Sequence, residues 1–495
     1  MKKRFISLMV AGVLASSMLL GGCGQPQAAG GGAGAEPKDT GKVIILYPGE
    51  ETDEMANFID NQLNPKLKEE IGEEVELVYK GWDQYWEQKD IMLSAGDAID
   101  LYWDGLQDIG IMVNKKQCQP LDELIATYGQ DMKKVIPDGQ LSGGVVDGIQ
   151  YGIPSAYAPS SGMFQLVCVR EDLLEEVGMN DIQTPDDLAE YAEKVAEAHS
   201  EISGPADIIY KPLTRYFQEE PLTWGSAGDT VVYGEKTKKA YNYFESEAFK
   251  KVAQFNRSMY EKGLYRDELT TNYNERDSRM QQGTYIWVEG SIGKENEIIS
   301  SVRANAPDAV LKSYILDPEQ DKYITACGGE VLCVPYSAQN PIGAIKFVNW
   351  LYTNKDNYMF ALYGPEGENY TVEDGRIVLN DPAFGGYFYE WMFRNVNYQM
   401  FTTDVTDEFI DTYTHWDDNA IESDIMAFHF DNTNVKSEQT AIGEIWNTQI
   451  MPILCGYVDY DTEFPKVQQA LKDAGMDKYL EEVQKQLDEY LASKK

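Results

Sequence analysis

Aromatic and acidic side chains that could bind a ligand occur close together in two stretches of the chain. Trp82, Tyr85 and Trp86 form the first stretch, and Trp103 is followed directly by Asp104 in the second. A sugar ring has polar edges and an apolar face, so a site for a neutral saccharide needs flat aromatic rings with carboxylates or amides around them. The two stretches therefore predict a saccharide-binding surface, provided that the fold brings them together.

The same spacing also fits ordinary packing. Trp82 and Trp86 are four residues apart and would share one face of a helix, so a buried position is an open alternative for this pair. Trp103 comes at the end of a predicted strand, where we expect it to face a ligand cleft.

Further candidates lie later in the chain. Trp224 is in a loop-like stretch and either faces the ligand or packs. Trp287 and Glu289 are two residues apart in a predicted strand, so their side chains point to the same side and are both in the cleft or both in the core. Residues 387–401 contain seven aromatic side chains, most of which must pack, and we name only Trp391 as a ligand contact.

Strands and helices alternate in the part of the chain that must position the first two stretches. The hydrophobic pattern predicts strands over 43–47, 75–79 and 99–103, with a helix over 85–94 that ends at Gly96. This order predicts an open parallel sheet, because parallel neighbours need a crossover helix. In such sheets a ligand lies beyond the carboxyl ends of the strands, where the aromatic residues occur.

A second lobe of α/β type is expected after residue 153. Its predicted elements are a strand over 164–169, a helix that begins at Thr184-Pro185, and a strand over 284–288. A helix over 341–352 should bury Trp350, and residues 466–491 have helical periodicity and many charges.

The N-terminus has the pattern of a secretion signal. Three basic residues precede an apolar stretch over 5–20, and Gly21-Gly22-Cys23 follow. Small residues directly before a cysteine resemble the lipobox of bacterial lipoproteins; an ordinary signal peptide with a nearby cysteine is the alternative. We expect residues 1–22 to be the signal peptide, Cys23 to carry a lipid, and residues 23–40 to form a flexible tether rich in Gly and Ala.

Composition argues against several classes of partner and cofactor. With 42 Lys and Arg against 82 Asp and Glu, the net charge is −40, which argues against binding nucleic acid. The three His residues lack ligand-like spacing, so we expect no metal and no cofactor. None of the six Cys residues forms a CxxC pair, and we interpret those other than Cys23 as small buried hydrophobic residues.

Several short phrases in a fixed order resemble family 1 extracellular solute-binding proteins of ABC importers. Besides the lipobox and the first strand, they are Ser94 to Leu101, Gln119-Pro120-Leu121-Asp122, Asp147-Gly148 with Tyr151 to Pro154, Val169 to Leu173, Thr184 to Leu188, and Asn340-Pro341 with Ala344, Phe347 and Leu351. The C-terminal third, with Tyr363-Gly364 and Asp374-Gly375, is similar to a longer branch of the family found in Gram-positive lipoproteins.

This resemblance implies a two-lobed α/β fold of the type II periplasmic-binding-protein kind, with hinge-crossing segments and a ligand cleft between the lobes. We expect lobe 1 to comprise residues 41–153 and 322–354, and lobe 2 to comprise residues 154–321 and 355–495. The implied function is capture of a sugar, most simply a neutral oligosaccharide, and its delivery to ABC permease subunits. The implied location is the outer face of the cell membrane, with the lipid as the anchor, and we expect a monomer. The positions that the family places in the cleft are Glu51, Trp103, Asp104, Tyr157, Trp287 and Glu289.

Two other functions remain open at this point. A secreted glycoside hydrolase needs two carboxylates about 5–10 Å apart, and a chain with 82 acidic residues can supply such a pair. A surface adhesin for glycans would bind sugar without an importer. The absence of a catalytic triad motif, a GxSxG motif or a phosphate-binding loop favours a carrier over an enzyme.

Overall fold

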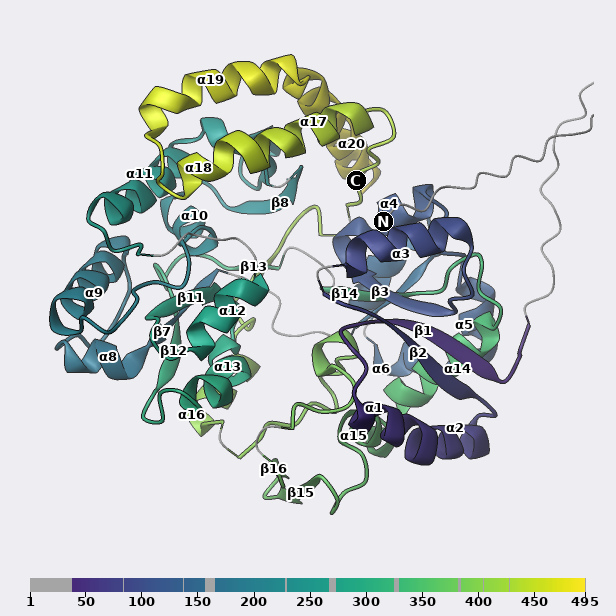
Figure 1. The fold of residues 1–495 in the computed structure, drawn as a ribbon. Helices are drawn as coiled ribbons and strands as arrows, with labels where there is room; N and C mark the ends of the chain where they lie inside the picture. Colours follow the sequence, from purple (N-terminus) through teal and green to yellow (C-terminus); the bar gives the residue numbers. More distant parts are fainter. Residues whose placement is uncertain are drawn as a thin grey trace, which may run out of the picture. The chain divides into compact units, whose positions relative to one another are not determined.

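Two large hydrophobic cores form, the first around a mixed sheet and the second around an antiparallel sheet. Figure 1 shows the two sheets and the helices that cover them. The computed structural model describes residues 38–82, 84–136, 138–155, 165–227, 229–266, 273–324, 329–381, 384–403, 405–426 and 428–494.

The first core surrounds a five-stranded sheet with the order β2-β1-β3-β14-β6. Its strands are β1 (Lys42–Pro48), β2 (Glu74–Lys80), β3 (Leu101–Gly105), β6 (Gly152–Pro154) and β14 (Glu330–Cys333). β1 pairs in parallel with both β2 and β3, which confirms the predicted parallel pairing. β14 is antiparallel to β3 and to β6, so strands from far along the chain complete the sheet.

Helices pack around this sheet, and the local sequence defines their ends. They include α1 (Asp53–Phe58), α2 (Asn64–Glu70), α3 (Tyr85–Ala95), α4 (Ile109–Asn114), α5 (Asp122–Tyr128), α14 (Pro341–Thr353) and α15 (Lys355–Tyr363). The side chain of Thr52 accepts a hydrogen bond from the Met55 amide and caps α1. α3 ends at Gly96, whose φ of 77° suits glycine. Trp350 in α14 is buried, as predicted.

A buried carboxylate fixes the start of α14 against β1. Asp100 accepts hydrogen bonds from the amides of Gln339 and Asn340, both at 2.7 Å, and from the amide of Ile44 at 2.9 Å. Asn340 is fully buried and caps the helix by accepting from the Gly343 amide at 2.9 Å. This network positions α14, the helix that follows β14 in the chain.

The second core surrounds an antiparallel sheet with the order β11-β7-β12. Its strands are β7 (Leu166–Arg170), β11 (Trp287–Gly290) and β12 (Leu311–Ile315), and its helices include α9 (Pro185–Ala198), α10 (Lys211–Phe217), α11 (Glu247–Glu261) and α13 (Lys294–Arg303). α9 begins with a capping box between Thr184 and Asp187, as its sequence indicates. A small separate cluster that includes Cys168 and Val288 covers the other side of the sheet.

A three-stranded antiparallel sheet and the C-terminal helices pack onto the second core. The strands are β8 (Leu222–Ser226), β9 (Val231–Gly234) and β10 (Lys239–Asn242), and the helices are α17 (Lys436–Ile445), α18 (Met451–Leu454), α19 (Tyr460–Asp473) and α20 (Met476–Ser493). The predicted helical tail is thus two helices, because Gly475, with φ of 91°, separates α19 from α20.

One predicted domain boundary is wrong. We expected residues 355–495 to belong to the second lobe, but Tyr358, Leu362 and Phe388 are buried in the first core. The physical reason is that α15 folds back on α14, and that Tyr387 stacks on Phe58 of α1 with ring centroids 3.8 Å apart. The other predicted boundaries remain predictions.

The chain passes between the two cores three times: between β6 and β7, between β12 and β14, and between Phe393 and Ile425. The second and third passages are joined, because β13 (Tyr323–Ile324) pairs in parallel with β17 (Ile421–Glu422). Lys322 reinforces this join by donating to the carbonyl of Trp416 and lying 4.2 Å from that ring.

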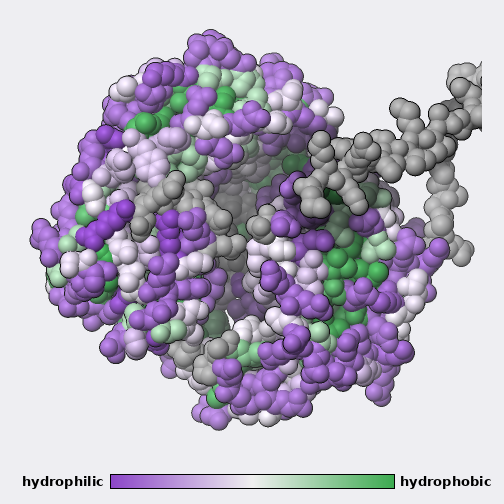
Figure 2. Space-filling view, in the orientation of Figure 1, coloured by the Kyte–Doolittle hydropathy of each residue, from purple (hydrophilic) through white to green (hydrophobic). Residues whose placement is uncertain are grey.

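Hydrophilic residues cover most of the surface in the view of Figure 2, as the high charge content predicts. None of the helices in the described ranges is long and apolar enough to cross a membrane. Cys118, Cys168, Cys333 and Cys455 are buried free thiols, as predicted for these four, and Cys327 lies outside the described residues.

Candidate functional site

The candidate site is built where three parallel strands end. β1 and β2 run in the same direction in a register that pairs Tyr47 with Tyr79 near their carboxyl ends. The residues after parallel strands meet at one edge of the sheet. Trp82 follows β2, α3 begins at Tyr85, and Trp103 lies in β3, so the fold brings the two predicted stretches together. Their role in binding remains a prediction.

Five aromatic side chains form what we call the aromatic cluster: Trp82, Trp86, Trp103, Tyr389 and Trp391. Ring centroids are 4.8 Å apart between Trp86 and Trp103, and 5.0 Å apart between Trp103 and Trp391. Tyr389 stacks on Trp391 at 5.5 Å and lies 5.6 Å from Trp82. The stretch rich in aromatic residues thus reaches the cluster from the first core, not from the second lobe as predicted.

The rings of the aromatic cluster differ in exposure. Trp82 is 38% exposed and Trp86 is 47% exposed, whereas Trp103 is 7% exposed and lies beneath them. A large exposed tryptophan is unusual in a soluble protein and marks a contact surface when it has aromatic neighbours. Trp82 and Trp86 therefore expose apolar ring surface, and Trp103 supports them.

Polar groups buried under the aromatic cluster hold it in place. Tyr85 is fully buried and donates to the carbonyl of Trp103 at 2.8 Å. The indole of Trp103 donates to the carboxylate of Glu330. Asp104 forms a buried ion pair with Lys89, whose ammonium group lies 4.8 Å from the ring of Trp86. These interactions hold the rings of Trp103 and Trp86 in place.

The carboxyl groups near the aromatic cluster have raised pKa values. Burial raises the pKa of Glu330 to about 7, and burial together with the charge of Asp104 raises the pKa of Asp108 to about 6. Burial also raises the pKa of Asp104, although the Lys89 ammonium group acts in the opposite direction. Near neutral pH, Glu330 therefore exchanges a proton and can either donate or accept a hydrogen bond.

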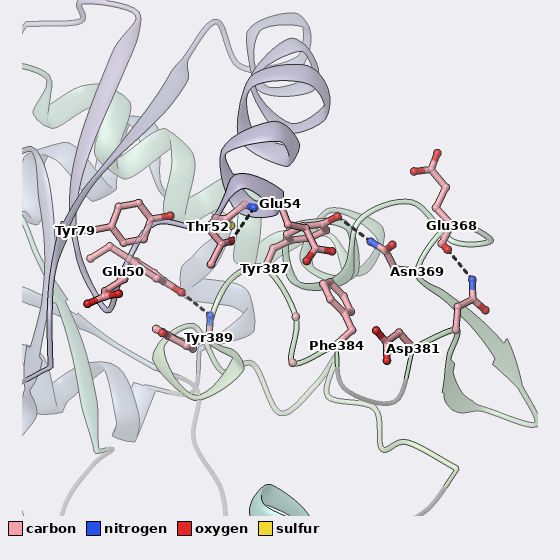
Figure 3. Close-up of a pocket in the computed structure, with 15 residues that line it drawn as sticks. Glu50, Thr52, Glu54, Tyr79, Glu368, Asn369, Asp381, Phe384, Tyr387 and Tyr389 are labelled. Carbon is pink, nitrogen blue, oxygen red and sulfur yellow. Dashed lines mark hydrogen bonds between the residues drawn. The ribbon is translucent and has the colours of Figure 1, made fainter. Parts of the chain in front are cut away.

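A pocket of about 510 Å³ lies next to the aromatic cluster (Figure 3). Its walls come from the end of β1, the loop that follows, the start of helix α1, Tyr79 of β2, and residues within 368–381 and 384–389. Tyr389 lines the pocket and also belongs to the aromatic cluster. On the pocket side it stacks on Tyr47, with ring centroids 5.1 Å apart and planes 6° apart. The pocket and the aromatic cluster are therefore neighbours that share one wall.

The side chains that line this pocket are acidic, amide and aromatic. They are Glu50, Glu54, Glu368, Asp381, Asn369, Asn380, Tyr47, Tyr79, Phe384, Tyr387 and Tyr389, together with Thr52, Met55, Gly385 and Gly386. The hydroxyl oxygen of Tyr79 is buried and has no hydrogen-bond partner among the described residues. Such a group is satisfied most simply by a ligand or a water molecule.

Glu51 and the second-lobe candidates do not join the aromatic cluster. Glu51 is exposed in the loop after β1, next to a residue that lines the pocket. Trp224 is half-buried in β8 and packs against Phe428 and Phe430, with ring centroids 5.6 Å and 6.1 Å away. Trp224 therefore belongs to the surface of the second core.

The expectation that Trp287 contacts a ligand is wrong for this conformation of the chain. Trp287 is fully buried, lies 6.3 Å from the ring of Tyr191, and donates to the carbonyl of Asp207 at 3.1 Å. Glu289 is also buried, and its carboxylate accepts from the amides of Tyr210 and Lys211 at the start of α10. The two side chains share one side of β11, as the alternation predicted, but that side faces the core.

Two predicted residues cannot be placed. Tyr157 and Cys23 both lie outside the described residues, so the ligand contact and the lipid site proposed for them remain predictions. In the ranges that the structure describes, no three side chains of His, Cys, Asp or Glu come together as a metal site.

Sequence reasoning missed Tyr389, Glu330 and Lys89. Tyr389 lies in the aromatic-rich stretch, which was a usable signal, but nothing distinguished it from its packed neighbours. Glu330 reaches Trp103 only because β14 pairs with β3 across more than two hundred residues, with Leu332 opposite Trp103. A pairing of that sequence separation leaves no local trace in the sequence.

Comparison with known proteins gives matches over nearly the whole chain. A carbohydrate ABC transporter substrate-binding protein of Streptococcus pneumoniae serotype 4 (strain ATCC BAA-334 / TIGR4) is 26% identical over 470 residues, which is 92% of each chain. A domain of unknown function, DUF3502, matches residues 424–492, which contain α17 to α20.

Solved structures share the fold. The N-glycan transport solute binding protein NgtS of Streptococcus pneumoniae has a TM-score of 0.75 and 22% identity, over 92% of this chain and 100% of that chain. The S. pneumoniae substrate binding protein FusA, solved with kestose, has a TM-score of 0.59 and 16% identity, over 91% of this chain and all of that chain. These matches confirm the predicted two-lobed binding-protein fold.

The family model described as bacterial extracellular solute-binding protein matches residues 64–365, which is more than half of the chain. The match includes α3, β3 and β14, the elements that carry Trp86, Trp103 and the buried polar groups that support them. The chain therefore belongs to the family of bacterial extracellular solute-binding proteins.

Proposed function

We propose that this protein captures a neutral oligosaccharide on the aromatic cluster and delivers it unaltered to the membrane subunits of an ABC importer. The observation that carries the proposal is the pair of exposed rings, Trp82 and Trp86, held over a buried set of carboxylates. The relative from S. pneumoniae supports carbohydrate as the cargo by its description. NgtS, which has the same fold, was solved with Man1GlcNAc and with Man5GlcNAc.

The proposed location is the outer face of the cell membrane. The lipobox pattern before Cys23 supports attachment through a lipid on that residue. The composition of residues 24–40 supports a tether that lets the folded part reach both the solute and the permease. The protein would act as a monomer.

The proposed mechanism is a shift between open and closed forms. A ligand that contacts both lobes stabilises the closed form by its extra contacts, and the permease then recognises that form. Trp103, which lies beneath the exposed rings, is already held by Tyr85 and Glu330, and the ammonium group of Lys89 lies against the ring of Trp86. Binding therefore needs little local rearrangement.

A carrier explains the carboxylates near the aromatic cluster better than a hydrolase does. Asp104 is buried in an ion pair with Lys89 and also accepts from the Gly105 amide at 2.8 Å. Glu330 accepts from the indole of Trp103. A glycoside hydrolase needs one carboxylic acid and one carboxylate that both reach the scissile bond. Here both groups are engaged in holding the binding surface.

Incubation of the purified protein with neutral oligosaccharides tests the proposal. Mannose- and N-acetylglucosamine-containing chains are the first candidates, with thermal unfolding and mass spectrometry of the recovered sugar as readouts. We expect a raised melting temperature and sugar of unchanged mass. Shortened sugars would instead establish a hydrolase, and the absence of any thermal shift across the panel would reject saccharide binding.

A further inference from the structure

The pocket beside the aromatic cluster has the shape and chemistry of a second ligand subsite. Its volume of about 510 Å³ lies within the range of small-molecule sites. It is made by three separate parts of the chain: the β1–α1 region, Tyr79 of β2, and residues 368–381 and 384–389 (Figure 3).

Hydrogen bonds and stacking fix the walls of this pocket. Asn369 donates to the hydroxyl of Tyr387 at 2.9 Å, and the ring of Tyr387 stacks on Phe58 at 3.8 Å. Asn380 donates to the carbonyl of Glu368 at 2.6 Å. The amide of Tyr389 donates to the hydroxyl of Tyr47 at 2.8 Å. The pocket is therefore a preformed cavity, as small-molecule sites usually are.

A continuous line of stacked rings joins the pocket to the aromatic cluster. Tyr47 stacks on Tyr389, Tyr389 stacks on Trp391, and Trp391 contacts Trp103. Tyr389 also lies against Trp82, whose ring is exposed. A ligand that rests on the outer tryptophans and extends past Tyr389 therefore reaches the pocket.

The lining residues indicate what enters the pocket. Glu50, Glu54, Glu368 and Asp381 contribute carboxylates, and the described residues that line the pocket include no Lys, Arg or His. Carboxylates and amides accept hydrogen bonds from hydroxyl groups. The four carboxylates also repel a negatively charged ligand. Tyr79 adds a buried hydroxyl group without a partner among the described residues. The lining suits a ligand rich in hydroxyl groups and without negative charge.

We propose that this pocket binds the far end of the oligosaccharide whose other sugars rest on the aromatic cluster, and that it selects longer neutral chains over short ones and over chains that end in an acidic sugar. This inference rests on the proposed function. It goes further because it assigns a second sugar subsite to named residues. It also assigns to these residues a preference for longer oligosaccharides and the exclusion of oligosaccharides that end in an acidic sugar.

Gly385, an exposed glycine among the lining residues, offers a way to place a large side chain at the pocket. It lines the pocket, its φ is not positive, and a Cβ added to it meets nothing within 4 Å. The substitution Gly385→Trp therefore introduces a large side chain without backbone strain. Gly443 in α17 also has open space at its Cβ position and lies outside the pocket. Gly443→Trp is the matched control.

The test compares calorimetric titrations of a disaccharide and a hexasaccharide of the same neutral sugars with the wild-type protein and both variants. We expect Gly385→Trp to weaken hexasaccharide binding about tenfold or more while disaccharide affinity changes less than about twofold. Gly443→Trp should leave both affinities unchanged. Circular dichroism and the melting temperature establish that each variant is folded.

A further arm with Glu54→Gln keeps the result decisive if Gly385→Trp does not fold. Glu54→Gln in the same titrations should narrow the preference for a neutral over an acid-terminated hexasaccharide, because it removes one of the four carboxylates. An unchanged hexasaccharide affinity in Gly385→Trp, or an unchanged neutral-to-acidic ratio in Glu54→Gln, would overturn the subsite. Equal loss of disaccharide and hexasaccharide binding in Gly385→Trp would also overturn it, because the first sugars would then lie in the pocket. Failure of the wild-type protein to bind any saccharide would reject the proposed function itself.

Discussion

At the scale of single residues, exposure separates tryptophans that can bind from those that support the fold. Trp86 is nearly half exposed, although its neighbour Tyr85 is fully buried. Trp287, in a strand end that sequence reasoning also assigned to the cleft, is fully buried. The same residue type is therefore exposed in α3 and buried in β11, and only packing distinguishes the two positions.

Truncation of these two tryptophans should have opposite effects. Trp287→Ala removes a fully buried ring and its hydrogen bond to Asp207, so we expect a loss of about 3–5 kcal/mol in the free energy of unfolding. Trp86→Ala should cost less than about 1 kcal/mol in stability but about 1–2 kcal/mol in sugar affinity. Urea unfolding and calorimetry measure the two quantities. Equal stability losses in both variants would show that Trp86 is a core residue.

Glu330 should make the stability of the protein depend on pH. The folded protein keeps the proton on Glu330 up to about pH 7, whereas the unfolded chain releases it near the ordinary pKa of a glutamate. The unfolded state therefore binds fewer protons between these pH values, and stability falls as the pH rises through this window. Glu330→Gln removes this loss of stability, because glutamine carries no titrating proton. It also keeps a side-chain oxygen that can accept the hydrogen bond from the indole of Trp103.

We expect wild type and Glu330→Gln to unfold at similar urea concentrations at pH 5. At pH 8 the variant should be more stable by on the order of 2 kcal/mol. A difference between the two proteins that is the same at both pH values would contradict the assigned raised pKa of Glu330.

At the scale of elements, the strands near the N-terminus could be predicted because each is a short apolar run bounded by turn residues. The run from Val43 to Tyr47 and the run from Val75 to Tyr79 both form strands that extend one residue further at each end. The meeting of Trp82 with Trp103 followed from parallel pairing alone. The contribution of β14, and with it Glu330, could not be predicted, because strand order depends on contacts between distant parts of the chain.

Asp100 anchors the start of α14, so even a substitution that keeps the size of its side chain should lower the stability of the protein strongly. Asp100→Asn keeps the size of the side chain but places an amide group against backbone amides that need an acceptor. We expect a loss of about 2–4 kcal/mol in the free energy of unfolding, measured by urea denaturation. Asp97→Asn, on an exposed side chain in the same loop, is the control and should change stability by less than about 0.5 kcal/mol. A loss no larger than that of the control would disprove the anchoring role of Asp100.

At the scale of the whole molecule, three passages of the chain connect the two cores. The pairing of β13 with β17 makes two of these passages act together. Arg215 in α10 fixes one of them, because it donates to the carbonyls of Gln320 and Asp321. The two passages that β13 and β17 join contain little helix or strand in their described residues. They are therefore suited to bending when the lobes close.

Closure on ligand should be visible in solution. We expect the radius of gyration from small-angle X-ray scattering to fall when a saturating oligosaccharide is added to the wild-type protein. Trp86→Ala should need a higher sugar concentration for the same change, because its affinity is lower. An unchanged radius at saturation would rule out closure as the response to ligand.

The most direct test of the central claim is a calorimetric titration of neutral oligosaccharide into three proteins: wild type, Trp86→Ala and Tyr336→Ala. Tyr336 is 55% exposed and follows β14 at the opposite edge of the sheet, so it controls for loss of an exposed aromatic side chain. We predict saturable one-to-one binding to wild type and Tyr336→Ala, and at least about fivefold weaker binding to Trp86→Ala. Equal affinities for all three proteins would contradict the assignment of the aromatic cluster as the sugar-binding surface.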